Sequence, residues 1–129
     1  MNEPRWVSRE VADAIHHEQI AEHGGSLGVR DEGLLLSALA RPRDRWAYDH
    51  DADLCAIAAA YAFGLAKNHA YVDGNKRVAL HVTYVFLRAN HLVLDAPEPE
   101  IVAVMLAVAD GTLSETALAL WLREHVSAA

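Results

Sequence analysis

Two long apolar segments, separated by a short polar one, constrain the fold of this chain more than any other feature of its sequence. Residues 54–66 read Leu-Cys-Ala-Ile-Ala-Ala-Ala-Tyr-Ala-Phe-Gly-Leu-Ala, which is apolar on every face of a helix. Residues 75–90 are apolar on most faces. A helix that is apolar all round has to be buried. The sequence therefore predicts two buried central helices, over 54–68 and 75–90.

Capping residues and helix breakers predict further helices before this pair. Ser8 is a good N-cap for a helix that ends at Gly24-Gly25, and Asp31 is a good N-cap for a helix that reaches Pro42. The following stretch, 43–53, is polar and aromatic. We expect it to form a loop or a short, poorly ordered helix.

Two more helices are expected near the C-terminus, one after Pro97 and one after Ser114. No segment alternates strictly between apolar and polar residues, so no strand is predicted. The expected fold class is all-α, a compact bundle of about six helices with two buried central helices.

The length and composition suit one globular domain over residues 1–129. The single cysteine, Cys55, excludes a disulfide framework within the chain. A formal net charge of −7 argues against direct binding of nucleic acid, which needs a basic surface. We also expect no membrane span and no signal peptide, because no apolar run is long enough and the first residues are polar. The expected location is the cytoplasm.

The chemistry is expected in the polar segment 68–77, between the two central helices. Lys76 and Arg77 fall in the first turn of the second helix. The helix dipole disfavours cations there by ~0.3–1 kcal/mol each. Two adjacent cations at this end therefore suggest an anion bound to the helix N-terminus, with Gly74 allowing close approach of the backbone.

His69 and Asp73 lie four residues apart in the same segment. Histidine is the usual general base near neutral pH, and a carboxylate beside bound phosphate is a natural Mg²⁺ ligand. This set suggests phosphoryl or nucleotidyl transfer. The residues alone leave a second interpretation open, in which Asp73 caps a turn and His69 is a C-terminal charge of the preceding helix.

Residues 69–77, His-Ala-Tyr-Val-Asp-Gly-Asn-Lys-Arg, resemble the signature loop of the Fic/Doc family, His-x-Phe-x-Asp/Glu-Gly/Ala-Asn-Gly/Lys-Arg. The Asn-Lys-Arg form resembles the Doc (death-on-curing) branch. Other stretches that resemble this branch are Gly24-Gly25, residues 31–35, Ala40-Arg41-Pro42, Phe86-Leu87-Arg88 and Trp121-Leu122-Arg123. Tyr71 stands where the family usually has Phe, which adds a hydroxyl that needs a partner.

The resemblance implies a role for each matching residue. His69 matches the catalytic histidine, which accepts the proton of a target hydroxyl. Asp73 matches the acidic residue that binds Mg²⁺. Gly74 and Asn75 match the positions of the anion cradle, and Arg77 matches the phosphate-binding arginine.

Two departures from the Fic pattern point to Doc-like chemistry. Lys76 replaces the glycine of AMP-transferring Fic enzymes, and Leu80 stands where such enzymes usually carry a second arginine. The resemblance therefore implies transfer of the γ-phosphate of ATP to a threonine, with Lys76 among the nucleotide-binding residues and Mg²⁺ as the metal. The implied target is elongation factor Tu, and the implied outcome is arrest of translation.

The implied protein partner is a small antitoxin with a disordered tail that folds onto the toxin. A hydrophobic groove for an amphipathic helix would serve this interaction. Two other functions stay open. One is AMP transfer to a protein hydroxyl by a Fic-like enzyme, and the other is a non-catalytic module that only binds an antitoxin or a nucleotide.

Overall fold

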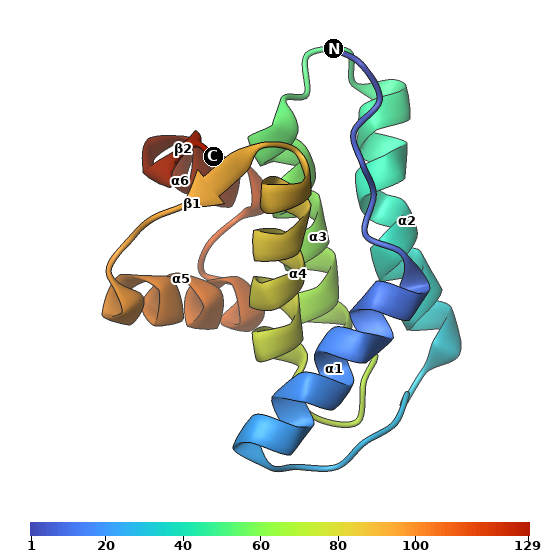
Figure 1. The fold of residues 1–129 in the computed structure, drawn as a ribbon. Coiled ribbons are helices and arrows are strands. Elements are labelled where there is room, and N and C mark those ends of the chain that lie inside the picture. The colour runs from blue at the N-terminus through green and yellow to red at the C-terminus, as the bar shows by residue number, and fades with distance from the viewer.

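The computed structural model describes residues 1–129 and consists of six helices and one small sheet (Figure 1). The helices are α1 (Arg9–His23), α2 (Glu32–Tyr48), α3 (Leu54–Asn68), α4 (Asn75–Ala89), α5 (Glu98–Asp110) and α6 (Glu115–His125). The strands are β1 (Leu92–Leu94) and β2 (Val126–Ala128). The all-α class, the six helices and the bounds of α1, α3 and α4 are as the sequence predicts.

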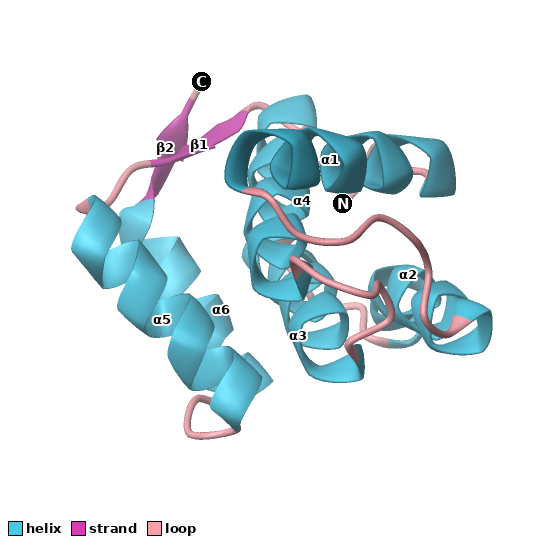
Figure 2. Cartoon of the chain, turned by 90° about the horizontal axis from the view of Figure 1, so that it is seen from below, coloured by secondary structure: helices cyan, strands magenta, loops and turns pink.

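Helices α3 and α4 form the centre of the bundle. In Figure 1 they lie side by side, α1 crosses in front of them, α2 lies on one side and α5 with α6 on the other. Seen from below, α5 and α6 form a separate pair next to α1–α4 (Figure 2). Nearly all of α3 is buried between Cys55 and Ala66. Its small residues allow close packing, since a Cβ at Gly64 would lie 3.3 Å from the Cα of Ala38.

The segment before α1 is fixed to the far end of this central pair. The buried hydroxyl of Tyr61 accepts a hydrogen bond of 2.9 Å from the backbone N–H of Val7. Trp6 stacks on Phe86, with ring centroids 6.3 Å apart, and meets Trp46 edge-on at 6.1 Å. An aromatic cluster therefore closes the end of the bundle opposite the α3–α4 loop.

Helix α2 continues six residues beyond the predicted end at Pro42, so the expectation of a loop or a short, poorly ordered helix over 43–53 is wrong for residues 43–48. Pro42 has no N–H to donate, which removes one helical hydrogen bond. The helix nevertheless continues, because Arg45 pairs with Glu115 of α6 at 2.9 Å and Trp46 packs against the core. Tertiary contacts thus override a local helix breaker.

The two strands were also missed by the sequence analysis. They form an antiparallel pair in which Leu92 faces Ala128 and Leu94 faces Val126. Each strand has only three residues, which is too short to show an alternating pattern. None of the six helices combines the length and the apolar character needed to cross a lipid bilayer.

Candidate active site

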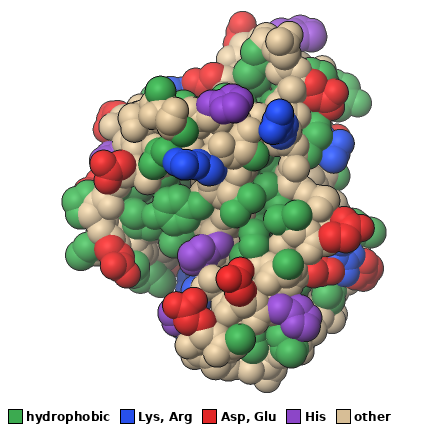
Figure 3. Space-filling model, in the orientation of Figure 1, with side chains coloured by type: hydrophobic (Ala, Val, Ile, Leu, Met, Phe, Trp, Pro, Cys, Tyr) green, Lys and Arg blue, Asp and Glu red, His purple; other side chains and the backbone are tan.

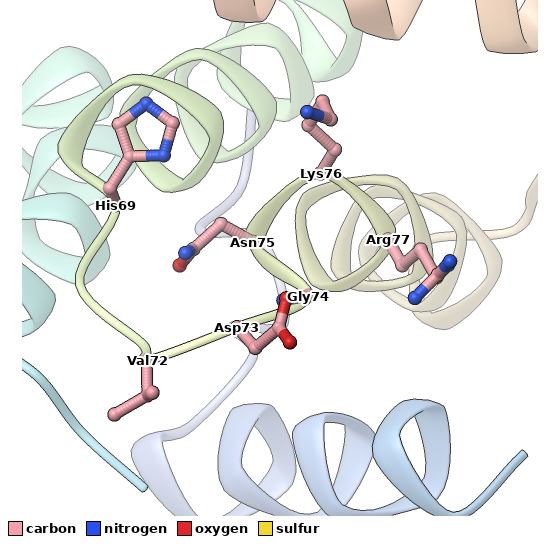
Figure 4. Close-up of a pocket in the computed structure, with 7 residues that line it drawn as sticks. All are labelled: His69, Val72, Asp73, Gly74, Asn75, Lys76 and Arg77. Carbon is pink, nitrogen blue, oxygen red and sulfur yellow. The ribbon is translucent and has the colours of Figure 1, made fainter. Parts of the chain in front are cut away.

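The segment between α3 and α4 and the first turn of α4 line a cavity of about 390 Å³. This volume lies within the range of small-molecule sites. All the residues singled out in the sequence are in its lining, which consists of His69, Val72, Asp73, Gly74, Asn75, Lys76 and Arg77 (Figure 4). In the close-up, His69 and Lys76 lie to one side of the start of α4 and the carboxylate of Asp73 to the other.

His69 ends α3 in the left-handed conformation, with φ 49° and ψ 45°. This conformation is uncommon for a residue other than glycine and needs support from its surroundings. Arg30 supplies that support. Its Nε donates to the carbonyl oxygen of His69 at 2.7 Å, and its Nη2 donates to the carbonyl oxygen of Asn68 at 3.1 Å. The guanidinium therefore caps the end of α3 and leaves the exposed imidazole free.

The backbone of the connection between α1 and α2 also holds the α3–α4 loop in place. The N–H groups of Arg30 and Asp31 donate to the carbonyl oxygen of Ala70, and the N–H of Val72 donates to that of Gly28. On the loop's other side, the side-chain amide of Asn75 bonds both the N–H and the carbonyl of Tyr71. The side-chain amide of Asn75 is thus occupied by the loop, and its backbone N–H remains without an acceptor.

The N-terminus of α4 is open. Its N-cap, Gly74, is left-handed with φ 76° and has no side chain to cap the helix. No acceptor bonds the backbone N–H groups of Asn75, Lys76 and Arg77. Neither Lys76 nor Arg77 is among the residues that form ion pairs. Free N–H groups, the positive end of the helix dipole and two free cations together make a site for an anion.

The carboxylate of Asp73 is held beside this anion site. Its Oδ1 accepts from the N–H of Gly74 at 2.8 Å. Its Oδ2 lies against Gly25, where an added Cβ would come within 2.5 Å of the oxygen. Gly25 also has a φ of 115°, which other residues rarely adopt. The sequence analysis gave Gly25 no role beyond ending the helix and resembling the Doc branch, whereas the structure shows that its missing side chain makes room for Asp73.

The donor set fits Mg²⁺ bound together with a nucleotide. No group of three or more His, Cys, Asp or Glu side chains comes together to hold a metal. Mg²⁺ usually keeps several waters and takes one or two carboxylates plus substrate phosphate oxygens. Asp73 offers one exposed carboxylate next to the anion site, and phosphates bound there would complete the coordination.

Tyr71 anchors the loop to α1. Its ring is buried, and its hydroxyl donates to Asp13 at 2.8 Å, which is the partner that the sequence analysis required. Burial and this carboxylate raise the pKa of Tyr71. The imidazole of His16 stacks on the Tyr71 ring, with centroids 4.2 Å apart and planes 14° apart. Burial lowers the pKa of His16, and the backbone of Asp73 partly offsets this effect as a hydrogen-bond acceptor.

Comparison with known proteins agrees with this geometry. Residues 6–87 match the sequence model of the Fic/DOC family. The chain belongs to this family. It is 34% identical to the protein named protein kinase doc of Escherichia phage P1. The alignment spans 120 residues, 92% of this chain and 94% of that protein. It is also 47% identical over 74 residues to the toxin Doc of Mycolicibacterium smegmatis, 57% of each chain.

Arg30 and Gly25 are the site residues that sequence reasoning missed. Each acts through long-range contacts, Arg30 on carbonyl groups of α3 and Gly25 on the side chain of Asp73. The signals for Gly25 were its place in a glycine pair at the end of α1 and the resemblance of that pair to the Doc branch, neither of which gave it a role at the site, and Arg30 had no signal.

Proposed function

We propose that this member of the Fic/Doc family is a Doc-like toxin that transfers the γ-phosphate of ATP to a threonine of a translation factor. Elongation factor Tu is the proposed target, arrest of translation the outcome and the cytoplasm the location. One observation carries the proposal. The uncapped N-terminus of α4 presents free N–H groups and two unpaired cations beside a histidine and a carboxylate.

Each residue of the site has a part in this reaction. The N–H groups of the first turn, Lys76 and Arg77 bind and orient the phosphates, and Asp73 holds Mg²⁺. Bound there, Mg²⁺ neutralises charge on the phosphate oxygens. His69 accepts the proton of the threonine hydroxyl as its oxygen bonds to the γ-phosphorus. The bond between that phosphorus and the β,γ-bridging oxygen breaks, and ADP leaves.

The surroundings of Arg77 favour phosphate over AMP as the transferred group. In the structure, Leu80 follows Arg77 along α4 and lines an apolar cavity with Val102, Met105 and Leu106. No second arginine extends the phosphate site along the helix in this direction, and the second cation of the site is Lys76, in the same turn as Arg77. A single strong anion site at the helix N-terminus supports a phosphotransferase of the Doc type.

Incubation with labelled ATP tests the proposal. The chain is mixed with purified elongation factor Tu, or with bacterial extract, and with ATP labelled at the α- or the γ-phosphate. We expect protein-bound label from γ-labelled ATP only, with one phosphate added to a threonine by mass spectrometry. Label from α-labelled ATP would instead indicate AMP transfer. No label on any protein, with ATP still bound, would indicate a non-catalytic binding module.

We further propose that a groove along α4 binds the helix of an antitoxin. Two apolar cavities follow each other along α4, one next to Arg77 and one on the following turns, lined by Tyr84, Val85, Arg88 and Ala89, and the proposed groove would run over both. Two side chains of α5 in this groove, Val102 and Leu106, are each 49% exposed. Figure 3 shows hydrophobic side chains in a band across this face, with single basic side chains among them. This surface suits an amphipathic helix with some acidic residues.

A charge placed in the groove tests this interface. Leu106→Glu is expected to abolish binding of the proposed antitoxin, as measured by calorimetry. Leu36→Glu, an equally exposed leucine on α2, is the matched control and is expected to bind normally. Normal binding by Leu106→Glu would exclude the groove as the docking site.

A further inference from the structure

A second polar cavity, of about 310 Å³, lies between α2 and α3. Lys67 and Asn68 belong to its lining, and the next residue in the chain is His69, which lines the cavity of the candidate active site. His69 therefore lies between the two cavities along the chain. The phosphates of ATP are proposed to occupy only the cavity at the start of α4, so the second cavity has no role in the reaction as described so far.

Close packing of α2 on α3 gives this second cavity a fixed floor. A Cβ at Gly64 would lie 3.3 Å from the Cα of Ala38 and 3.4 Å from the Cδ of Arg41. Towards the end of α3, the side-chain amide of Asn68 donates to the carbonyl oxygen of Leu34 at 2.9 Å. These contacts pair the start of α2 with the end of α3, so the two helices run antiparallel.

Two cations of the cavity lie near one aromatic ring. The Cζ of Arg41 is 5.0 Å from the centroid of the Phe63 ring, and the Nζ of Lys67 is 6.0 Å from it. Arg41 has a countercharge, because its Nε bonds Glu115 of α6 at 2.7 Å. Lys67 takes part in none of the ion pairs of the chain. An ammonium that lies near a ring and has no partner can bind an incoming carboxylate.

The carboxylates of the surrounding helices leave the charge of Lys67 available. Asp110, at the end of α5, accepts from the N–H and the hydroxyl of Thr112 at 2.9 and 2.7 Å. These hydrogen bonds, and to a smaller extent the charge of Lys67, lower the pKa of Asp110. Asp44 also lines the cavity, but the antiparallel packing places this part of α2 at the end away from His69. The cavity is therefore positive next to His69 and negative at its other end.

We propose that this cavity docks a carboxylate side chain of the protein that receives the phosphate, and that Lys67 is the residue that selects it. The inference rests on the proposed phosphate transfer for the identity of that protein. With ATP at the start of α4, the acceptor hydroxyl has to reach His69 where the nucleotide leaves space, and the cavity between α2 and α3 adjoins His69 and stays free. An extended chain advances ~3.4 Å per residue, so a carboxylate a few residues from the hydroxyl can reach Lys67.

Variants of Lys67 separate its charge from its packing. Lys67→Met removes the ammonium but keeps an unbranched side chain near Phe63, and Lys67→Arg restores a cation. Arg43→Met is the matched control. Arg43 is an exposed cation without an ion pair, and it lies over the ring of Trp6, in the aromatic cluster at the far end of the bundle.

The first measurement needs no catalysis. Two capped peptides, Ala-Glu-Ala-Thr-Ala and Ala-Gln-Ala-Thr-Ala, are titrated into the full chain. The backbone amide NMR signals of Ser37 and Asn68, which line the cavity, are followed. We expect the glutamate peptide to shift both signals at about tenfold lower concentration than the glutamine peptide. Lys67→Met should abolish this preference, Lys67→Arg should keep most of it and Arg43→Met should keep all of it.

The second measurement is the rate of phosphate transfer at varied concentrations of elongation factor Tu and of ATP. We expect Lys67→Met to raise the KM for the protein about tenfold, because a charge-assisted contact is lost. The kcat and the KM for ATP should stay unchanged. Arg43→Met should alter none of the three quantities.

Three results would overturn the inference. The parent chain could bind both peptides equally, or the preference for glutamate could persist in Lys67→Met. The third is a Lys67→Met variant that raises the KM for ATP instead of the KM for the protein, which would show that the ammonium serves the nucleotide. Absence of transfer from γ-labelled ATP would count against the proposed function alone, since the peptide titration decides on the docking site without it.

Discussion

The two central helices have the same length, but a side chain caps the N-terminus of α3 and none caps that of α4. Helix α3 begins at Asp53, whose side chain accepts from the N–H of Ala56 at 2.8 Å and is itself paired with Arg123 of α6 at 2.6 Å. Helix α4 begins at Gly74, with no side-chain cap and with Lys76 in its first turn. The positive end of α3 is neutralised within the protein, and that of α4 is left open.

This difference separates what stabilises the fold from what binds a ligand. The chain uses side-chain caps elsewhere, since α1, α2, α3 and α6 are each preceded by a Ser or Asp side chain that accepts a backbone hydrogen bond. At α4 the sequence provides cations instead, which costs stability unless an anion arrives. The open end thus indicates a site whose missing charge comes from a ligand.

Removal of His69, which lines the cavity at the uncapped N-terminus of α4, should have the largest effect on phosphate transfer. His69→Ala removes the proposed general base, and we expect phosphate transfer to fall by about 10²–10⁴-fold. Because the imidazole is exposed, the melting temperature and the affinity for ATP should change little. The measurement is the initial rate of labelling from γ-labelled ATP. A variant that modifies its target at the parental rate would disprove the role of His69.

An acid in the first turn should make the start of α4 resemble that of α3. Lys76→Glu places a favourable charge there and should stabilise the protein by ~0.3–1 kcal/mol. It also removes a charge-assisted contact, so ATP affinity should fall by about 10–100-fold. Thermal melting and calorimetry on one sample measure both effects. A gain in stability with unchanged ATP binding would show that the open end is not the phosphate site.

Loss of the guanidinium that caps α3 should affect the reaction but not the binding. Arg30→Met removes two hydrogen bonds to the carbonyl groups of Asn68 and His69. The left-handed backbone of His69 then loses its support, and we expect the transfer rate to fall about tenfold at unchanged ATP affinity. Arg5→Met, an exposed arginine without an ion pair, controls for the lost charge. Equal rates for the two variants would contradict the positioning role.

Loss of the side-chain cap at the N-terminus of α3 should lower the stability without changing ATP binding, and it should have the smallest effect of the four changes. Asp53→Ala removes a cap and a half-exposed ion pair, and we expect a loss of about 1–2 kcal/mol at pH 7 with unchanged ATP affinity. The hydrogen bonds from Arg123 lower the pKa of Asp53 below its usual 3.8. Its contribution is therefore present above pH 3.8 and disappears as the pH falls through the lowered pKa.

Urea unfolding at pH 7 and near pH 2 measures this difference, with Asp44→Ala, an exposed aspartate without an ion pair, as the control. The gap between Asp53→Ala and the parent protein should close at the lower pH. A gap that stays constant would indicate a packing effect instead.

The sequence predicted what depends on local patterns. The apolar character of α3 and the caps of α1 and α6 are visible within one helix, and the structure has them where they were expected. The six site residues come from one continuous segment, so their proximity followed from the spacing of the motif. Their chemical roles remain predictions.

What the sequence did not predict depends on contacts between distant segments. The second half of α2 is helical because Arg45 meets Glu115, 70 positions later. Arg30 reaches the end of α3 across 39 positions, and Gly25 matters only because the carboxylate of Asp73 lies against it. A single sequence carries no pattern for such pairs, which arise only when the helices pack.

The aromatic cluster at the far end of the bundle determines which spectroscopic signal can follow this protein. Trp6 and Trp46 lie in that cluster, Trp121 stacks on His125 in α6, and none of the three lines the cavity of the candidate site. Intrinsic fluorescence will therefore report the unfolding of the bundle and remain unresponsive to a nucleotide at the start of α4. A dye-labelled nucleotide is needed to observe occupancy of that site.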